Sequence, residues 1–131
     1  MDNAFYNHVM SRIVLWVSDI KHQADFYSAL FGTTVKSRGT EFLEVSDGQN
    51  SVLLHLLPAP FRTSAEDVRV QDEVAIKPVF VVSDIDMAKS RVTQFKVRFG
   101  SEKNTYGDST YLDCIDPEGN VIQVSEKTVK L

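Results

Sequence analysis

The sequence contains an internal repeat in which four identical residues recur 65 positions apart. Residues 17–20 and residues 82–85 both read Val-Ser-Asp-Ile. Each copy follows a run of β-branched and aromatic residues, which is typical of a strand, and precedes apolar residues spaced with a helical period. The aspartate in each copy is placed to cap the helix that follows. Because the offset is about half of the 131 residues, the chain is predicted to contain two copies of one unit.

Each half of the chain continues with further strands after its helix. In the first half, residues 24–31 carry apolar side chains on a helical period, and Gly32 predicts the end of that helix. In the second half, a helical period that runs through Ile85, Ala88, Val92 and Phe95 predicts the other helix. Turn-forming residues at 47–50 and 116–120 separate the last two strands of each half. The predicted strands are residues 12–17, 33–37, 41–45 and 51–57 in the first half, and residues 77–82, 97–100, 110–115 and 121–125 in the second.

These elements predict an α+β fold built from two tandem βαβββ modules. The modules cover about residues 10–58 and 75–128, and the proline-containing segment at about 59–74 is interpreted as a linker with a short helix. Each module is expected to form a curved mixed sheet with its own helix on one face, and the two concave faces are expected to enclose a cavity. At this length the chain, residues 1–131, is expected to be a single domain.

The composition argues against several classes of protein. Cys114 is the single cysteine, so an internal disulfide is excluded and a reducing, cytoplasmic location is expected. The longest aliphatic runs are far shorter than the roughly 20 residues that cross a bilayer, and the first residues lack the pattern of a secretory signal, so no membrane partner is expected. The net charge is -4 and the Lys and Arg residues are scattered, which argues against a nucleic-acid partner.

Three segments resemble the vicinal oxygen chelate superfamily, which includes glyoxalase I, bleomycin-resistance proteins and extradiol dioxygenases. They are the strand end at residues 17–19 (V-x-D), the helix at residues 24–32 (ADFYSALFG) and the turn at residues 116–120 (DPEGN) before the last strand. Together with the repeat, they extend the resemblance over nearly the whole chain. The resemblance implies that the binding site lies between two modules, which pair either within one chain or across two chains. It also implies that the protein forms a homodimer.

In the members of this superfamily that use a metal, four strand positions supply the ligands. The resemblance places these positions at Arg12, His55, Lys77 and Gln123. Arginine and lysine are cations at neutral pH and would repel a divalent metal ion. One imidazole and one amide fall short of the three protein ligands that are typical of a catalytic metal site. The sequence therefore predicts no metal and no other cofactor.

Strand alternation predicts which side chains face the cavity. Residues of one parity are aliphatic and should face the helices, whereas residues of the other parity mix apolar and hydrogen-bonding groups, as small-molecule pockets do. The two cations of this set either form ion pairs with its two carboxylates or hold an anionic group of a ligand. The predicted ligand-binding residues are Arg12, Trp16, Phe42, Glu44, His55, Lys77, Tyr111, Asp113 and Gln123.

Three functional classes are compatible with these residues. The first, which the unsuitable metal ligands favour, is a glyoxalase/bleomycin-resistance-like protein that binds a small organic molecule, anionic or neutral, without a metal. The second is an enzyme of the glyoxalase, isomerase or dioxygenase type. It would use either a metal with atypical ligands or His55 as a general base, with Arg12 stabilising an oxyanion. The third is a structural or partner-regulated protein whose cavity has collapsed.

Two further residues have alternative interpretations. Tyr106 lies in a loop-like segment at residues 103–108, which either gates the pocket or only connects two strands. Cys114 is predicted to face the helix of its module. Burial there would make it an inert apolar residue rather than a nucleophile.

Overall fold

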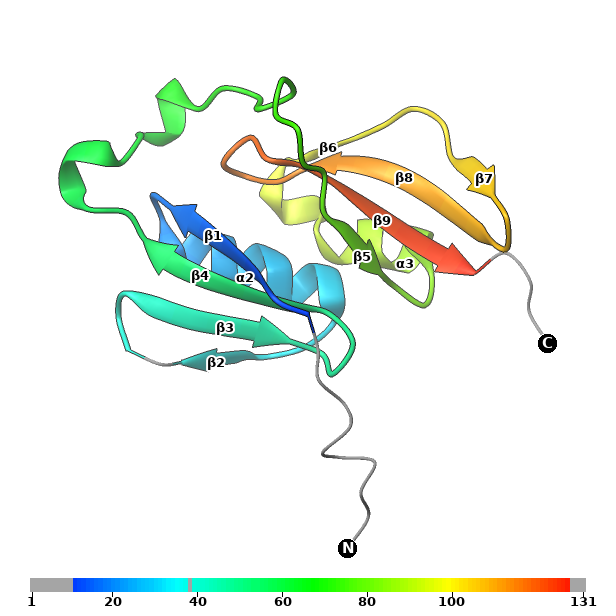
Figure 1. Ribbon diagram of the computed structural model, residues 1–131, viewed down its shortest axis with the longest axis horizontal. Coiled ribbons are helices and arrows are strands. Elements are labelled where there is room, and N and C mark those ends of the chain that lie inside the picture. Colours follow the sequence, from blue (N-terminus) through cyan, green and yellow to red (C-terminus); the bar gives the residue numbers. More distant parts are fainter. Residues whose placement is uncertain (1–10, 38, 128–131) are drawn as a thin grey trace, which may run out of the picture.

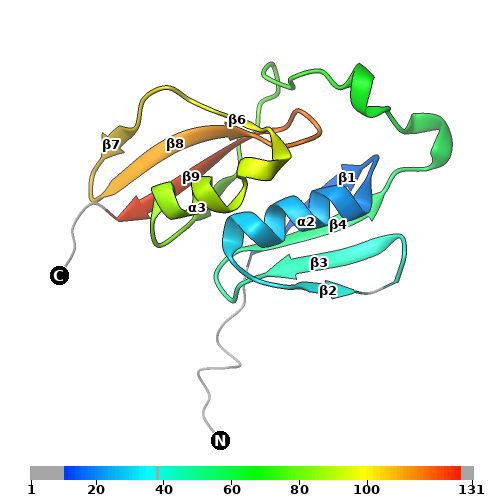
Figure 2. The ribbon, with the colours of Figure 1, turned by 180° about the vertical axis from the view of Figure 1, so that it is seen from behind.

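The computed structural model describes residues 11–37 and 39–127, which form two sheets that lie side by side (Figure 1). Helix α2 (Ile20–Phe31) packs on the first sheet and helix α3 (Ile85–Arg91) on the second. Both helices lie on the same side of the molecule, which leaves the opposite faces of the two sheets free of helices (Figure 2). No helix in the described residues has the length and apolar character needed to cross a bilayer. The architecture is the predicted α+β arrangement of two βαβββ-like modules.

Both sheets are mixed. The strand order is β1-β4-β3-β2 in the first sheet and β5-β9-β8-β6 in the second, where β7 also pairs with β8. In each module the first strand runs parallel to the last, and the other neighbours are antiparallel. The strands are β1 (Ile13–Val17), β2 (Val35–Ser37), β3 (Phe42–Ser46), β4 (Ser51–Leu56), β5 (Val79–Val81), β6 (Arg98–Phe99), β7 (Asn104–Tyr106), β8 (Ser109–Ile115) and β9 (Val121–Lys127).

The linker, defined here as residues 57–78 between β4 and β5, contains two short 3-10 helices. They are η1 (Ala59–Phe61) and η2 (Ala65–Asp67), and a third, η3 (Thr93–Phe95), follows α3. In Figure 1 the linker runs across one end of both sheets. It therefore lies over the space between the two modules.

The alternation of side chains along the strands builds the core between the sheets and the helices. Val52 and Leu54 of β4 are fully buried. Trp16 of β1 pairs with His55 of β4, which alternates with Leu54, so it faces the other side of the sheet and is 58% exposed. The predicted strand register is therefore correct. The buried core includes Val17, Phe26, Tyr27, Leu30, Val45, Val52, Leu54, Phe80, Ile85, Leu112, Cys114, Ile122 and Val124.

Helix α2 begins and ends where the sequence predicts. The side chain of Asp19 accepts a backbone N–H of the first turn, and Gly32 adopts a left-handed conformation (φ 69°) that ends the helix. The guanidinium of Arg91 in α3 donates to the carbonyl oxygens of Ala29 and Leu30 at 2.7 and 2.8 Å. These bonds satisfy carbonyls that the end of a helix leaves free, and they join the two helices.

Two elements differ from the predictions. Residues 104–106, predicted as part of a loop, form β7 and close onto β8 through a two-residue turn in which Gly107 has a φ of 62°. The second sheet therefore has five strands rather than four, and because β7 is short and fully exposed its sequence shows no alternation. The second helix ends at Arg91, and η3 continues the chain to Lys96, which has a φ of 56°.

The turn between the last two strands of each module binds the first strand of the other module. The side-chain amide of Asn50 donates to the carbonyl of Val81 at 2.7 Å and accepts its N–H at 2.9 Å. The carboxylate of Glu118 accepts the N–H groups of Ser18 and Asp19, which follow β1, at 2.8 to 3.0 Å. These reciprocal contacts, which occupy corresponding places in the two halves of the repeat, hold the two sheets relative to each other.

A buried carboxylate strengthens this connection. Asp116, which is 3% exposed, accepts the hydroxyl of Tyr27 at 2.6 Å and the side-chain amide of Gln23 at 3.0 Å, both from α2. It also accepts the side-chain amide of Asn120 and the backbone N–H groups of Glu118 and Asn120. Burial, followed by the neighbouring carboxylate, raises the pKa of Tyr27 well above its usual value, so its hydroxyl remains a donor.

Candidate functional site

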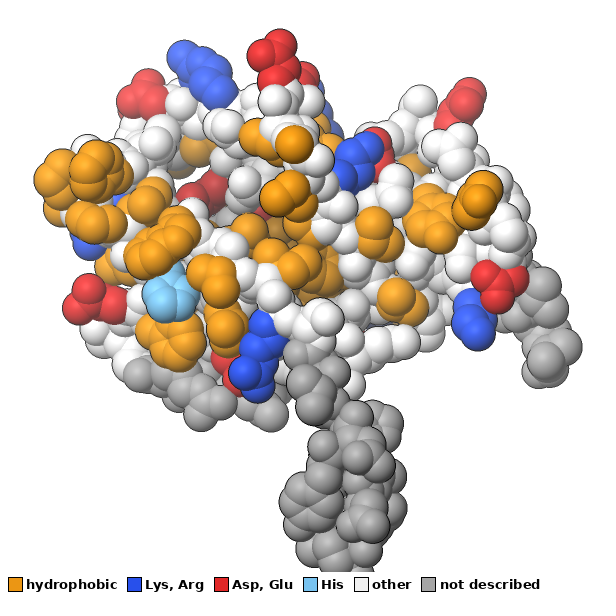
Figure 3. Space-filling view, viewed as in Figure 1, with side chains coloured by type: hydrophobic (Ala, Val, Ile, Leu, Met, Phe, Trp, Pro, Cys, Tyr) orange, Lys and Arg blue, Asp and Glu red, His pale blue; other side chains and the backbone are white. Residues whose placement is uncertain are grey.

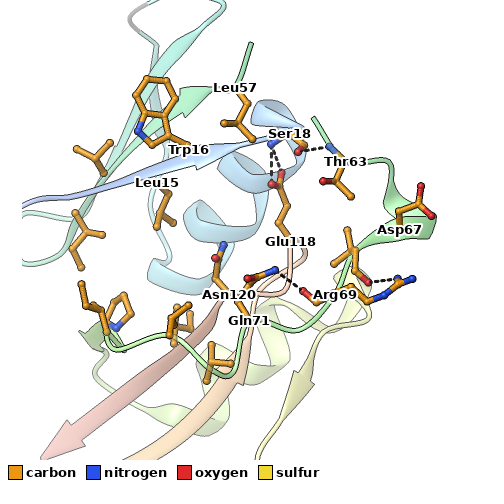
Figure 4. Close-up of a pocket in the computed structure, with 18 residues that line it drawn as sticks. Leu15, Trp16, Ser18, Leu57, Thr63, Asp67, Arg69, Gln71, Glu118 and Asn120 are labelled. Carbon is orange, nitrogen blue, oxygen red and sulfur yellow. Dashed lines mark hydrogen bonds between the residues drawn. The ribbon is translucent and has the colours of Figure 1, made fainter. Parts of the chain in front are cut away.

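A cavity of about 590 Å³ lies between the two modules (Figure 4). One wall is β1, the second is the linker, and the third is the turn at residues 116–120 with the start of β9. This volume lies in the range of about 300 to 1,000 Å³ that is typical of small-molecule sites. Its apolar lining includes Leu15, Trp16, Leu57, Val74, Ile76 and Val121. The third functional class, a protein with a collapsed cavity, is therefore not favoured.

Large apolar side chains remain exposed around this cavity. Val14, Trp16, Val74 and Ile76 all line it, and they are 48, 58, 56 and 75% exposed. Figure 3 shows hydrophobic side chains gathered on this face over β1, β4 and the linker. Because exposed apolar groups that gather around a hollow mark interaction sites, the exposure of these side chains favours a ligand or a partner here.

One end of the cavity is built from Glu118, Ser18 and the linker. The three N–H bonds to the Glu118 carboxylate come from the residues that lead from β1 into α2. Burial raises the pKa of the Glu118 carboxyl, while the N–H bonds from Asp19 and Ser18 act in the opposite direction. The hydroxyl of Ser18 accepts the N–H of Thr63 at 2.8 Å, which ties the linker to the end of β1.

The other attachment of the linker is to the turn of the second module. The N–H of Gln71 donates to the carbonyl of Gly119 at 2.7 Å, and Gln71 forms an isolated parallel bridge with Asn120. A Cβ at Gly119 would overlap the carbonyl group of Arg69, so only glycine permits the backbones to approach this closely. The side chains of Gln71 and Asn120 consequently lie beside each other in the cavity wall (Figure 4).

The predicted site residues of the first module form a row across the sheet. Trp16, His55 and Phe42 occupy paired positions on β1, β4 and β3. The imidazole of His55 lies between the two other rings, with centroids 4.8 Å from Trp16 and 4.5 Å from Phe42. Arg12 lies 3.6 Å from the carboxylate of Glu44, which is buried. Of these five residues, only Trp16 lines the cavity.

The predicted site residues of the second module form a separate group on the face of their own sheet. Lys77 contacts the carboxylate of Asp113 at 3.2 Å, and the amide of Gln123 donates to the same carboxylate at 3.0 Å. Tyr111 is partly buried on β8. Each of the two cations, Arg12 and Lys77, therefore forms an ion pair with a carboxylate of its own module, which is the first of the two roles that the sequence left open for them. A role of these residues in ligand binding stays a prediction.

The four positions at which related proteins bind a metal do not fit a metal here. Arg12 and Lys77 are cations without a free lone pair, and each already contacts a carboxylate. In residues 11–37 and 39–127, no group of three or more His, Cys, Asp or Glu side chains is arranged so that it could hold a metal ion. Within the same residues the imidazole of His55 contacts two rings and has no hydrogen-bond partner, and its role as a general base stays a prediction.

Sequence reasoning did not find most of the cavity lining. Nine lining residues, from Leu57 to Pro78, belong to the linker, where no periodicity predicts which side chains turn inward. The interpretation of Tyr106 as a gate is wrong. It lies on β7 at the far end of the second sheet, is 81% exposed, and does not line the cavity. The only available signal for the linker was its set of apolar residues within a charged segment.

Cys114 is fully buried among the core residues, as predicted. Burial raises the pKa of its thiol to about 12, with smaller effects from Asp116 and Asp113. We expect the native protein to resist Ellman's reagent at about pH 8, under conditions in which urea-unfolded protein reacts completely. Because the folded pKa is raised, this group's contribution to stability is lost as the pH rises from about 9 toward 12. Rapid, stoichiometric labelling of native protein would contradict this account.

Comparisons with known proteins place this geometry among related structures. An integron cassette protein from the mobile metagenome of V. cholerae is 28% identical, with a TM-score of 0.62 over 90% of this chain and 94% of that chain. TnmS3, an antibiotic binding protein from Streptomyces sp. CB03234, is 20% identical, with a TM-score of 0.62 over 91% of this chain and 95% of that one. A glyoxalase/bleomycin resistance protein from Albidiferax ferrireducens T118 is 14% identical, with a TM-score of 0.65 over 89% of this chain and 98% of that chain.

The last two likenesses show the fold alone. No match was found among curated protein sequences. Residues 6–124 match the family described as the Glyoxalase/Bleomycin resistance protein/Dioxygenase superfamily. The match covers most of the chain, and it includes both modules, the repeat and the walls of the cavity. The chain therefore belongs to the glyoxalase/bleomycin resistance protein/dioxygenase superfamily.

Proposed function

We propose that this protein binds a small organic molecule, without a metal, in the cavity between its two modules. The observation that carries the proposal is the cavity of about 590 Å³ around which apolar side chains stay exposed. If a molecule filled the cavity, it would cover Trp16, Val74 and Ile76, and the apolar surface that it removes from water contributes about 25 cal/mol per Å². The structural likeness to a protein that binds an antibiotic supports this class of function.

The metal-free part of the proposal rests on the donor set. The positions that would supply ligands hold Arg12 and Lys77, and their cationic groups favour anions over metal ions. The predicted cytoplasmic location, which rests on the single cysteine, is also part of the proposal.

We include a homodimer in the proposal, as the resemblance implies. Support comes from the helix-free faces of the two sheets, where Val79 and Val81 of β5 are 45 and 37% exposed beside the exposed side chains of β1. A second copy of the chain could cover both faces through a two-fold interface.

Trp16 offers a direct test, because it is the single tryptophan and lines the cavity. Its indole N–H should give one resonance in a ¹H–¹⁵N spectrum. We expect 2-naphthol, an uncharged planar probe, to shift this resonance saturably in protein treated with EDTA. Because Ile76 forms part of the wall, Ile76→Ala should weaken binding by about threefold to tenfold.

The matched control is Tyr106→Ala, which removes an exposed apolar side chain outside the cavity and should leave the affinity unchanged. Plasma mass spectrometry of untagged protein should find no stoichiometric metal. The proposal is wrong if no saturable shift occurs up to the solubility limit of the probe. It is also wrong if binding appears only after zinc or nickel is added.

A further inference from the structure

We propose that the cavity is built for an uncharged, planar molecule that presents an O–H or N–H donor. This inference rests on the proposed function, because it names the class of ligand for the same cavity. Three properties of the lining carry it: its charge, its free hydrogen-bonding atoms and the position of its aromatic ring.

The charge of the lining does not suit an anion. The two cations that the sequence offered for this purpose, Arg12 and Lys77, contact carboxylates on the faces of the sheets and do not line the cavity. The charged residues that do line it are Asp67, Arg69 and Glu118, so carboxylates outnumber cations. An anionic ligand would meet more like charges than opposite ones in this lining.

The same carboxylates already accept hydrogen bonds from the protein. Both oxygens of Glu118 already accept backbone N–H groups, and Asp67 accepts the hydroxyl of Ser64 at 2.9 Å. A cationic ligand would have to share oxygens that already accept these bonds, so its charge would be only partly paired in a site with an apolar wall. Burial of an unpaired charge is costly, so an uncharged ligand fits best.

Two amide oxygens of the lining remain free to accept a hydrogen bond. The NH₂ group of Asn120 donates to the carboxylate of Asp116 at 2.9 Å, and that of Gln71 points to the carbonyl of Arg69 at 3.3 Å. Because both of these partners can only accept, they fix which end of each amide is the nitrogen. Within the described residues neither amide oxygen has a partner. Two neighbouring acceptors therefore favour a ligand that donates.

The aromatic ring lies across the cavity from these amides. Figure 4 places Trp16 on the opposite side of the cavity from Gln71 and Asn120. The indole contacts His55 at a tilt of 48°, and the side chain remains more than half exposed. A flat molecule can thus stack on the indole and direct a donor toward the amides.

Four naphthalene derivatives test these three properties separately. They are 2-naphthol (uncharged, with a donor), 2-methoxynaphthalene (uncharged, without a donor), 2-naphthoate (anionic) and 2-naphthylmethylammonium (cationic). The Trp16 indole resonance reports the affinity of each. We expect 2-naphthol to bind about fivefold to tenfold more tightly than 2-methoxynaphthalene and at least about tenfold more tightly than either ion.

Gln71→Met keeps the length of the side chain and removes the amide. It should abolish most of the preference for 2-naphthol over 2-methoxynaphthalene, while the affinity for 2-methoxynaphthalene stays within about twofold. Gln94→Met, at an exposed glutamine outside the cavity, is the matched control and should keep the preference. Circular dichroism checks that both variants fold.

The outcomes separate the inference from the function on which it rests. If none of the four probes shifts the Trp16 resonance saturably, the proposed function fails and the inference fails with it. If the probes bind but an ion binds most tightly, only the inference is wrong. It is also wrong if 2-naphthol and 2-methoxynaphthalene bind equally, or if Gln71→Met leaves the preference unchanged.

Discussion

Replacement of Asp116 with alanine is expected to lower the free energy of unfolding by about 3 to 5 kcal/mol. The carboxylate is buried and accepts the hydroxyl of Tyr27 and the amide of Gln23, so its loss leaves two buried donors of α2 without a partner. It also removes the acceptor for the amide of Asn120. Urea unfolding followed by circular dichroism measures the change.

The repeat supplies a matched control in Asp47. This residue accepts the backbone N–H groups of Gln49 and Asn50 and the Asn50 amide, but it is exposed and bonds nothing in α2. Asp47→Ala should therefore cost only about 1 kcal/mol. Equal losses for the two aspartates would show that the bonds between Asp116 and α2 contribute nothing to stability.

Gly119→Ala is expected to destabilise the protein by about 3 kcal/mol and to displace the linker. Gly119 has a φ of 88°, and an added Cβ would overlap the backbone of Arg69. Because Gln71 donates to the carbonyl of Gly119, the displacement should reach the cavity wall. We expect faster trypsin cleavage after Arg69 and weaker binding of 2-naphthol.

Gly48 is the matched control for this substitution. It has the same φ of 88° in the corresponding turn of the first module, but an added Cβ would meet nothing within 4 Å. Gly48→Ala should therefore show only the backbone cost, about 1 to 2 kcal/mol, with unchanged trypsin cleavage and ligand binding. If the two alanine variants behave alike, the close approach of the linker to the turn is not important.

The sequence predicted the fold because local signals and the repeat agree. The aspartates at 19 and 84 cap helices in both halves, and alternation assigned the buried face correctly in β1, β4, β5, β8 and β9. Strand β7 was missed because three exposed residues carry no alternation. The length of the second helix was also overestimated, since the chain turns into a 3-10 helix after Arg91.

The candidate site was less predictable, for a physical reason. Alternation assigns residues to faces of a sheet, and it placed Trp16, His55 and Lys77 on the helix-free faces. The cavity is instead closed by the linker, whose path depends on hydrogen bonds of Thr63 and Gln71 to groups distant in sequence. Such contacts leave no periodic signal. Because these contacts bring Asp67, Arg69 and Glu118 into the lining, we propose an uncharged ligand, whereas the sequence left an anionic or a neutral one open.

The most direct test of the account is to locate a bound probe. Intermolecular nuclear Overhauser effects between 2-naphthol and methyl-labelled protein identify the side chains that it touches. We expect contacts with the methyl groups of Val74, Ile76 and Val121, which line the cavity. Contacts confined to Val79 and Val81, which are exposed on β5 outside the cavity, would contradict it.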